Sequence, residues 1–217
     1  MKTKIVLIGL SMLFGFSVFS QKSFSEGTIN YDIVINTGTD KPQAADFLDG
    51  ATSTIYVKGS KSRTEMVSSL GTQATIIDGS KNAISVLKEY GDQKYLIQLT
   101  PSDWKDANKR NENVQFSFTN EVKTIAGYSC KKAIGKLADG TSFTVWYTTD
   151  LVPENKDFQN ANKALPGLAM EYEASMGSLI VTYTVSKISF SPVPAVKFDL
   201  PKAGYRVLTY AESKGGK

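Results

Sequence analysis

The chain has 217 residues, 41% of them hydrophobic, and a formal net charge of +4 at pH 7, which suits one domain with a sizeable core. It contains no histidine and one cysteine, so Ser-His and Cys-His nucleophile pairs and a multi-thiolate zinc site are excluded. The positive charges are scattered rather than gathered into runs, and nucleic acid is therefore not an expected partner.

The N-terminus has the pattern of a secretory signal. Lys2 and Lys4 precede an uncharged, mostly apolar run, and small polar residues follow it. We predict a signal peptide over residues 1–20, cleaved between Ser20 and Gln21, and a mature protein that is periplasmic or secreted. The apolar run is shorter than the roughly 20 residues that a membrane helix needs. We therefore expect no integral membrane segment in the mature form.

Beyond the signal, the dominant hydrophobic period is two. In "GTINYDIVIN", residues 27–36, apolar and polar side chains alternate, which is typical of an antiparallel strand with one face in the core. Similar runs recur down to "SLIVTYTVSKISF", residues 178–190. Asp78-Gly79 and Asp139-Gly140 suit tight two-residue turns, and Lys58–Ser60, Tyr90–Asp92 and Met176–Ser178 are weaker turn signals.

Two segments have helix signals. Thr100 suits an N-cap, followed by Pro101 at the first helical position, and Asp40 and Gly50 could bound a second short helix. Short helices need a larger surface to pack on. We predict a mainly β domain over residues 21–210, a single curved antiparallel sheet forming an incomplete, half-open barrel with short helices on its concave side. Residues 211–217 are expected to be a disordered tail.

Few residues suggest chemistry. Glu171 and Glu173 would lie on one strand face, where a solvated edge is the simpler interpretation than a glycosidase pair. Cys130 lies within a strand pattern and is expected to be a small buried hydrophobe. Neither a phosphate loop nor a calcium loop is apparent. We predict no cofactor, no metal site and no catalytic residues.

Aromatic and methionine side chains on the strands leave two interpretations. They could line an apolar cavity of the kind that small ligands or acyl chains occupy, or they could fill the core. Under the first interpretation the ligand-binding residues are Tyr31, Ile33, Tyr56, Met66, Phe116, Phe118, Tyr147, Met170 and Tyr172.

Three blocks carry a family resemblance: "IAGYSCKKA" at residues 125–133, "WYTTD" at 146–150 and "LPGL" at 165–168. In this order they resemble the exported bacterial proteins named for a GLPGLI signature and a sister group of secreted domains of unknown function. Ala164 and Ala169 depart from the signature and favour the sister group. Such proteins are similar to periplasmic lipoprotein carriers and localisation factors. That resemblance implies a half-barrel whose concave face holds acyl chains, and it supplies no catalytic residues.

The residues and the resemblance together predict a non-enzymatic exported protein that binds a hydrophobic ligand, a lipid or a lipidated protein, in a half-barrel cavity. The alternative is a cell-envelope interaction module with a filled core, no ligand and a protein partner. A hydrolase is the third interpretation, and the lack of histidine counts against it. "LPGL" itself suits a type II turn, with Pro166 at the second position and a positive φ at Gly167.

Overall fold

The structure is a computed structural model that describes residues 21–36, 50–176 and 179–215. The predicted signal peptide, most of the helix expected between Asp40 and Gly50, and the turn expected after Met176 lie outside the described residues. The strands are β1 (Lys22–Phe24), β2 (Glu26–Asn36), β3 (Thr52–Lys58), β4 (Lys61–Ser68), β5 (Gly71–Asp78), β6 (Ala83–Tyr90), β7 (Gln93–Leu99), β8 (Gln115–Ile125), β9 (Tyr128–Lys136), β10 (Ser142–Thr148), β11 (Leu151–Pro153), β12 (Leu168–Met176), β13 (Leu179–Ser189) and β14 (Arg206–Thr209).

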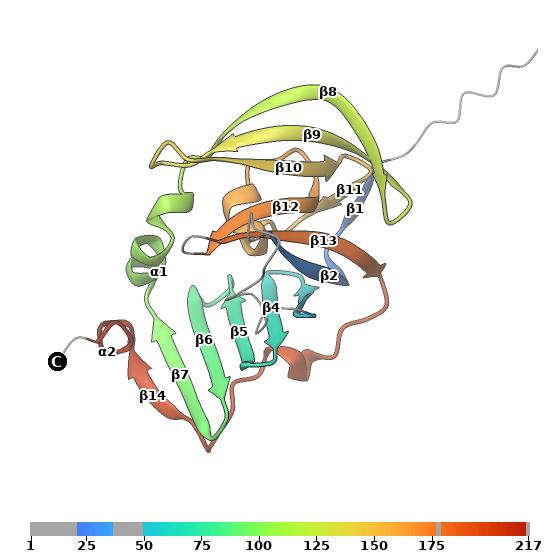
Figure 1. Ribbon diagram of the computed structural model, residues 1–217. Coiled ribbons are helices and arrows are strands. Elements are labelled where there is room, and N and C mark those ends of the chain that lie inside the picture. Colours follow the sequence, from blue (N-terminus) through green and yellow to red (C-terminus); the bar gives the residue numbers. More distant parts are fainter. Residues whose placement is uncertain (1–20, 37–49, 177–178, 216–217) are drawn as a thin grey trace, which may run out of the picture.

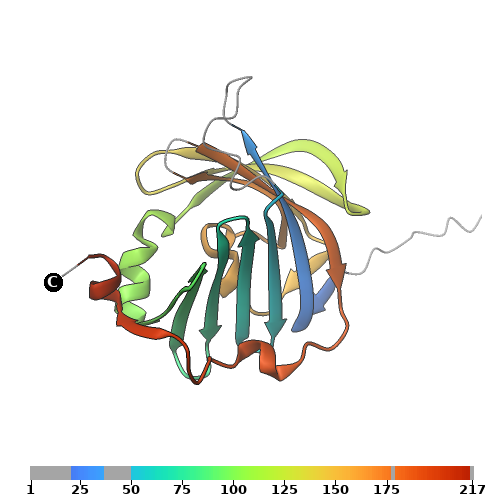
Figure 2. The ribbon, with the colours of Figure 1, turned by 60° about the horizontal axis from the view of Figure 1, so that its bottom comes forward.

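One large curved sheet dominates the molecule (Figures 1 and 2). Its strand order is β14-β7-β6-β5-β4-β3-β2-β13-β12-β10-β9-β8, and it does not close into a barrel. The predicted fold class, a mainly β chain with one curved, half-open antiparallel sheet, is thus confirmed. Two parallel pairings were not predicted: β14 adds to the edge of the sheet beside β7, and β1 pairs with β11 separately.

The sheet has two halves that meet at a central seam. Strands β3–β7 form one half, β8–β10 and β12 form the other, and the antiparallel pair β2–β13 joins them. The core lies along this seam, where Ile29, Val57 and Met170 are fully buried. Tyr31 crosses it, and its hydroxyl donates to the carbonyl of Ala169 at 2.8 Å. A buried phenol is normally hydrogen-bonded, so this contact fixes how the halves approach each other.

Short helices lie against the sheet. They are α1 (Pro101–Ala107), η1 (Lys109–Asn111), η2 (Asp157–Asn162), η3 (Ala195–Phe198) and α2 (Tyr210–Ser213). The helix predicted after Thr100 is confirmed: Thr100 and Asp103 form a reciprocal capping box around Pro101. The predicted tail begins with part of α2, which the same kind of box between Thr209 and Glu212 starts.

The 3-10 helix η2 was not predicted from the sequence. It lies inside the curve of the sheet and contacts both β4 and β12 (Figure 2). The Gln159 side chain anchors it, donating to the carbonyl of Gly167 at 3.2 Å and accepting from the amide of Ala169 at 2.9 Å. The concave side is therefore spanned by a polar segment that bridges the two halves.

Two turn predictions were wrong. Strands β5 and β6 pair from Asp78 to Ala83, so residues 79–82 form a longer connection and the positive φ, 49°, falls on Asn82. The amide of Gly79 instead donates to the carbonyl of Ser60 in the neighbouring hairpin. Gly167 is not among the residues with positive φ, so "LPGL" is not a type II turn. The turn at Gly140 has the expected positive φ, 87°.

The convex face of the first half is covered by the C-terminal segment. Strand β13 leads through η3 across this face, and the segment then turns into β14 (Figure 1). Tyr205 packs on the buried residues Ala74, Ile76, Leu87 and Leu96. Cys130 in the second half is fully buried, as predicted, and burial raises the pKa of its thiol to about 11.

Candidate functional site

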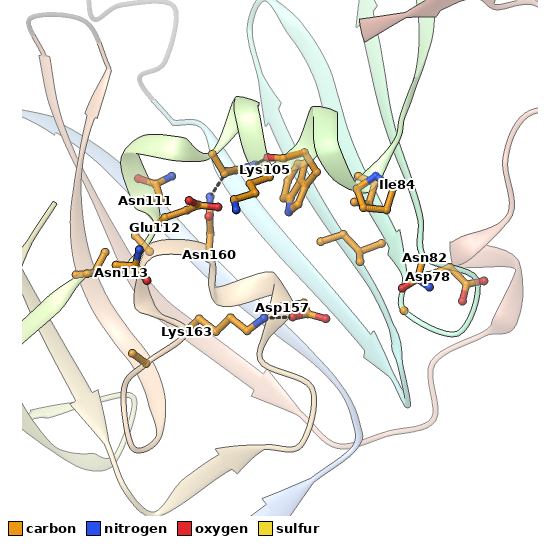
Figure 3. A pocket seen from close by; sticks show the side chains of 18 residues that line it. Asp78, Asn82, Ile84, Lys105, Asn111, Glu112, Asn113, Asp157, Asn160 and Lys163 are labelled. Carbon is orange, nitrogen blue, oxygen red and sulfur yellow. Dashed lines mark hydrogen bonds and ion pairs between the residues drawn. The ribbon is translucent and has the colours of Figure 1, made fainter. Parts of the chain in front are cut away.

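A cleft of about 750 Å³ opens at one end of the concave side (Figure 3). Four segments form its walls: the β5–β6 connection, α1, the stretch from Asn108 to Val114, and η2 with the residues that follow it. The segments are far apart in the sequence, and the curvature of the sheet brings them together. The cleft is thus a product of the whole fold rather than of one loop.

Polar side chains line this outer cleft. Five asparagines contribute to it, together with acids and lysines from several segments: Asn82, Asn108, Asn111, Asn113, Asn160, Asp78, Glu112, Asp157, Lys105 and Lys163. Three of the asparagines, at 82, 113 and 160, have positive φ between 47° and 54°. Asparagine adopts positive φ more often than most non-glycine residues. The backbone at three corners of the cleft therefore favours the residue type found there.

Trp104 is the aromatic residue of the outer cleft. The capping box places it in the first turn of α1, where its half-buried indole packs on the apolar residues Ile77 and Ile84. Its remaining surface faces the cleft among the amides. The site thus combines one large aromatic surface with many neutral donors and acceptors.

A second cavity of about 490 Å³ continues inward from the first. The two share Ile77, Trp104, Asp157, Asn160 and other lining residues, so they form an outer and an inner part of one site. We call the inner part the inner chamber. Its floor on β3, β4 and β5 consists of Ser53, Thr64, Met66, Gln73 and Thr75, and η2 covers it with Gln159 and Asn162.

The other half of the sheet supplies the far wall of the inner chamber. Tyr172 on β12 and Tyr183 on β13 are cross-strand partners, and their rings stack with centroids 4.9 Å apart and an interplanar angle of 6°. Both line the chamber. Burial raises the pKa of both phenols, so their hydroxyls stay protonated through the neutral range.

Two acidic side chains of the site, Asp157 and Asp78, have charged or hydrogen-bonding partners. Asp157 and Lys163 form an ion pair. The Ser80 hydroxyl donates to Asp78 at 2.6 Å and, together with Lys61, holds the pKa of Asp78 below its ordinary value. Among the described residues, no group of three or more His, Cys, Asp or Glu side chains could hold a metal ion.

An ion pair joins η1 to the second half of the sheet beside the inner chamber. Arg110 donates to Asp139 at 2.6 Å. Hydrogen bonds from Thr141 and then from Arg110 lower the pKa of Asp139 to about 2. This ion pair links η1 to the β9–β10 turn and fixes one rim of the site.

Two of the predicted ligand-binding residues line the inner chamber, namely Met66 and Tyr172. Three others, Tyr31, Ile33 and Met170, are packed in the core at the seam. Their proposed role in binding stays a prediction.

The remaining predicted residues lie elsewhere. Tyr147 is buried, and Phe118 packs on it from the exposed edge strand β8, where Phe116 also lies. Tyr56 points to the opposite face of the sheet, where Lys197 lies 4.6 Å from its ring centroid. Period-two alternation separates the two faces of a strand, but it does not identify which of them is concave.

The predicted site residues did not include Trp104, Tyr183, Asn162 or the hydroxyl residues of the floor. A signal for the floor was present: Ser53, Thr64 and Thr75 occupy inward-facing positions of three consecutive strands. Buried positions of a strand are usually apolar. Small polar residues at such positions in neighbouring strands can therefore indicate a lined cavity.

The description "N-glycanase peptide, N-terminal domain" belongs to a family model that matches residues 46–210. The chain belongs to this family. Comparison with curated proteins gave no match. The family is β-rich, in agreement with the predicted class, but the comparisons give no support to the GLPGLI or lipoprotein-carrier assignment. Among the described residues, no helix is long and apolar enough to cross a membrane.

Solved structures with similar folds include PNGF-II, in two crystal forms. The first is 14% identical to this chain, with a TM-score of 0.48. The matched region covers 88% of this chain and 33% of the PNGF-II chain. The second has 14% identity, a TM-score of 0.42 and coverages of 84% and 31%. The chain thus spans about a third of the length of PNGF-II. An uncharacterized conserved protein from Thermus thermophilus is 10% identical with a TM-score of 0.49, covering 84% of this chain and 90% of its own.

Proposed function

We propose that this chain is an exported, non-catalytic module that binds a carbohydrate in the cleft beside Trp104. The observation that carries the proposal is the exposed indole surface surrounded by amide side chains. A sugar ring has an apolar C–H face that can stack on an indole, and hydroxyls that both donate and accept hydrogen bonds. Asparagine amides supply both functions. The family description, which names an N-glycanase, supports glycans as the ligand class.

The non-catalytic part of the proposal rests on the chemistry available in the cleft. The chain has no histidine, and Asp157 is neutralised by Lys163. The lowered pKa of Asp78 makes it a hydrogen-bond acceptor rather than a proton donor at neutral pH. Export is proposed from the N-terminal signal pattern.

The hydrophobic ligand expected from the sequence is the competing proposal. Met66, Phe143 and the two stacked tyrosines of the inner chamber favour it. Against it, an acyl chain would cover the hydroxyls and amides of the floor without giving them partners, which costs about 1–3 kcal/mol for each buried group. The polar lining therefore favours a ligand that forms hydrogen bonds.

Tryptophan fluorescence tests the proposal, because the chain has two tryptophans. Trp146 lies outside the cleft, with Lys123 4.4 Å from its ring centroid, so the Trp146→Phe variant leaves Trp104 as the sole indole reporter. We expect saturable changes in its emission with N-glycan oligosaccharides. By calorimetry, Trp104→Phe should weaken binding about tenfold, or ~1.4 kcal/mol, while Trp146→Phe binds like the parent. Saturable uptake of a fluorescent fatty acid, with no response to any oligosaccharide, would contradict the proposal.

A further inference from the structure

Asn162 has an unusual position in the wall of the inner chamber. Its side chain belongs to η2 and is 3% exposed, and its Oδ1 has no hydrogen-bond partner within the part of the chain that the structure describes. A buried acceptor without a partner is unfavourable, and proteins normally supply a side chain, a water or a ligand. The adjoining space has a volume of about 490 Å³, whereas a single water occupies about 30 Å³.

The chamber floor has the same character. Thr64 and Thr75 are direct cross-strand partners on β4 and β5. In the neighbouring row of the sheet, Met66 pairs with Ser53 on one side and with Gln73 on the other. Within the described ranges, 21–36, 50–176 and 179–215, no hydrogen bond is formed by the side chains of Ser53, Thr64, Gln73 or Thr75. Three hydroxyls and one amide are thus available to a molecule in the chamber.

Two ion pairs neutralise most of the formal charges around the chamber. Arg110 is paired with Asp139, and Asp157 is paired with Lys163. Glu173 accepts a hydrogen bond from the backbone amide of Thr144 at 2.8 Å. An anionic ligand group would find no unpaired cation among the described lining residues and would lose its hydration. The available partners are neutral donors and acceptors, beside the stacked rings of Tyr172 and Tyr183.

We infer that the inner chamber is a recognition subsite for a neutral, hydroxyl- and amide-bearing end group of the ligand, and that Asn162 determines its specificity. The inference rests on the proposed function, since the same ligand would pass over Trp104 in the outer cleft. It also gives the orientation of the ligand in the site. The terminal group of the ligand inserts beneath η2, and the middle of the ligand chain does not.

Three sugars with the same ring type separate the possibilities: N-acetylglucosamine is neutral, glucosamine is a cation and glucuronate is an anion. We expect the unmodified protein to bind the neutral sugar at least tenfold more tightly than the anionic one. Asn162→Leu should reduce that affinity at least tenfold without lowering the urea midpoint of unfolding, because Oδ1 makes no internal hydrogen bond. Thr75→Val should reduce it several-fold. Thr72→Val is the matched control on the convex face of the same strand and should bind normally.

A second variant tests the same position by reversing the preference. Asn162→Asp keeps an acceptor and adds a negative charge, so it should favour glucosamine over N-acetylglucosamine. If sugars bind in a Trp104-dependent way but are insensitive to both Asn162 variants and to Thr75→Val, the inference is wrong and the proposed function stands. A crystal structure of the sugar complex with only ordered water beside Asn162 would have the same meaning. If none of the sugars binds the unmodified protein, and N-glycan oligosaccharides fail as well, both proposals fall.

Discussion

Gly167 illustrates how a single residue depends on distant neighbours. A Cβ built at this position would lie 1.9 Å from the carbonyl oxygen of Thr148, far inside contact distance. The residue is therefore a glycine because β10 passes close to the backbone, although its φ is not positive. The local motif predicted a type II turn because Pro-Gly supports that geometry, and the close approach of another strand is not visible in a local motif.

Gly167→Ala should lower the free energy of unfolding by about 1–3 kcal/mol, because the backbone of Thr148 cannot move aside without disturbing the sheet. Urea unfolding followed by circular dichroism measures the change. Gly140→Asn is the control: the space beside Gly140 is open, its φ is positive, and asparagine tolerates that conformation. Equal losses in the two variants would show that steric contact is not the reason for the glycine.

Among the elements, η2 has the largest influence on the site. It forms the roof of the inner chamber and one wall of the outer cleft. Its position depends on the buried side chain of Gln159. That amide donates one hydrogen bond and accepts another at the start of β12. Side-chain amides can mimic a backbone group in this manner. A polar loop thereby becomes a fixed part of the binding site.

Gln159→Met should destabilise the protein by about 1–3 kcal/mol, since the buried amide of Ala169 would lose its acceptor. Hydrogen exchange should show faster exchange of that amide, and ligand affinity should fall as the roof loosens. Gln98→Met provides a control at an exposed position on β7. Unchanged protection of the Ala169 amide in Gln159→Met would contradict the anchoring role.

Strands and α1 could be predicted from the sequence, whereas η2 could not. Alternation in "GTINYDIVIN" and the cap at Thr100 are local signals, and both elements form as expected. The stretch "ENKDFQNANK" has no helical period, and Asn160 interrupts η2 with φ 47°. Its structure follows from packing between β4 and β12. The candidate site was missed for the same reason, because its residues come together only through the curvature of the sheet.

At the scale of the molecule, the C-terminal segment is held to the convex face by carboxylates. Glu26 binds Lys58 and accepts from the amide of Val193, and these contacts lower its pKa below the ordinary 4.5. Glu89 accepts from the hydroxyl of Tyr205 and from Lys94, with the same effect on its pKa. The ionised carboxylates are thus part of what fixes the segment to the sheet.

Acid should therefore release the segment. A carboxyl with a lowered pKa in the folded state contributes stability that is complete above its unfolded value, here 4.5, and is lost as the pH falls through the folded value. Urea midpoints should be flat at neutral pH and should fall below about pH 4.5. The double variant Glu26→Gln/Glu89→Gln should be less stable at pH 7 and should show a shallower decline in acid. Asp92→Asn, in an exposed turn, is the control, and an identical acid profile in the double variant would refute the assignment.

The seam between β2 and β13 also has a kinetic consequence. Each half of the sheet is largely a meander whose neighbouring strands meet through short turns, so each can begin to form early. The Tyr31–Ala169 hydrogen bond spans 138 residues. Closing so long a loop carries an entropic cost that local turns avoid. We therefore expect the joining of the two halves to be the slow step of folding, with the edges of β2 and β13 open to other chains until it occurs.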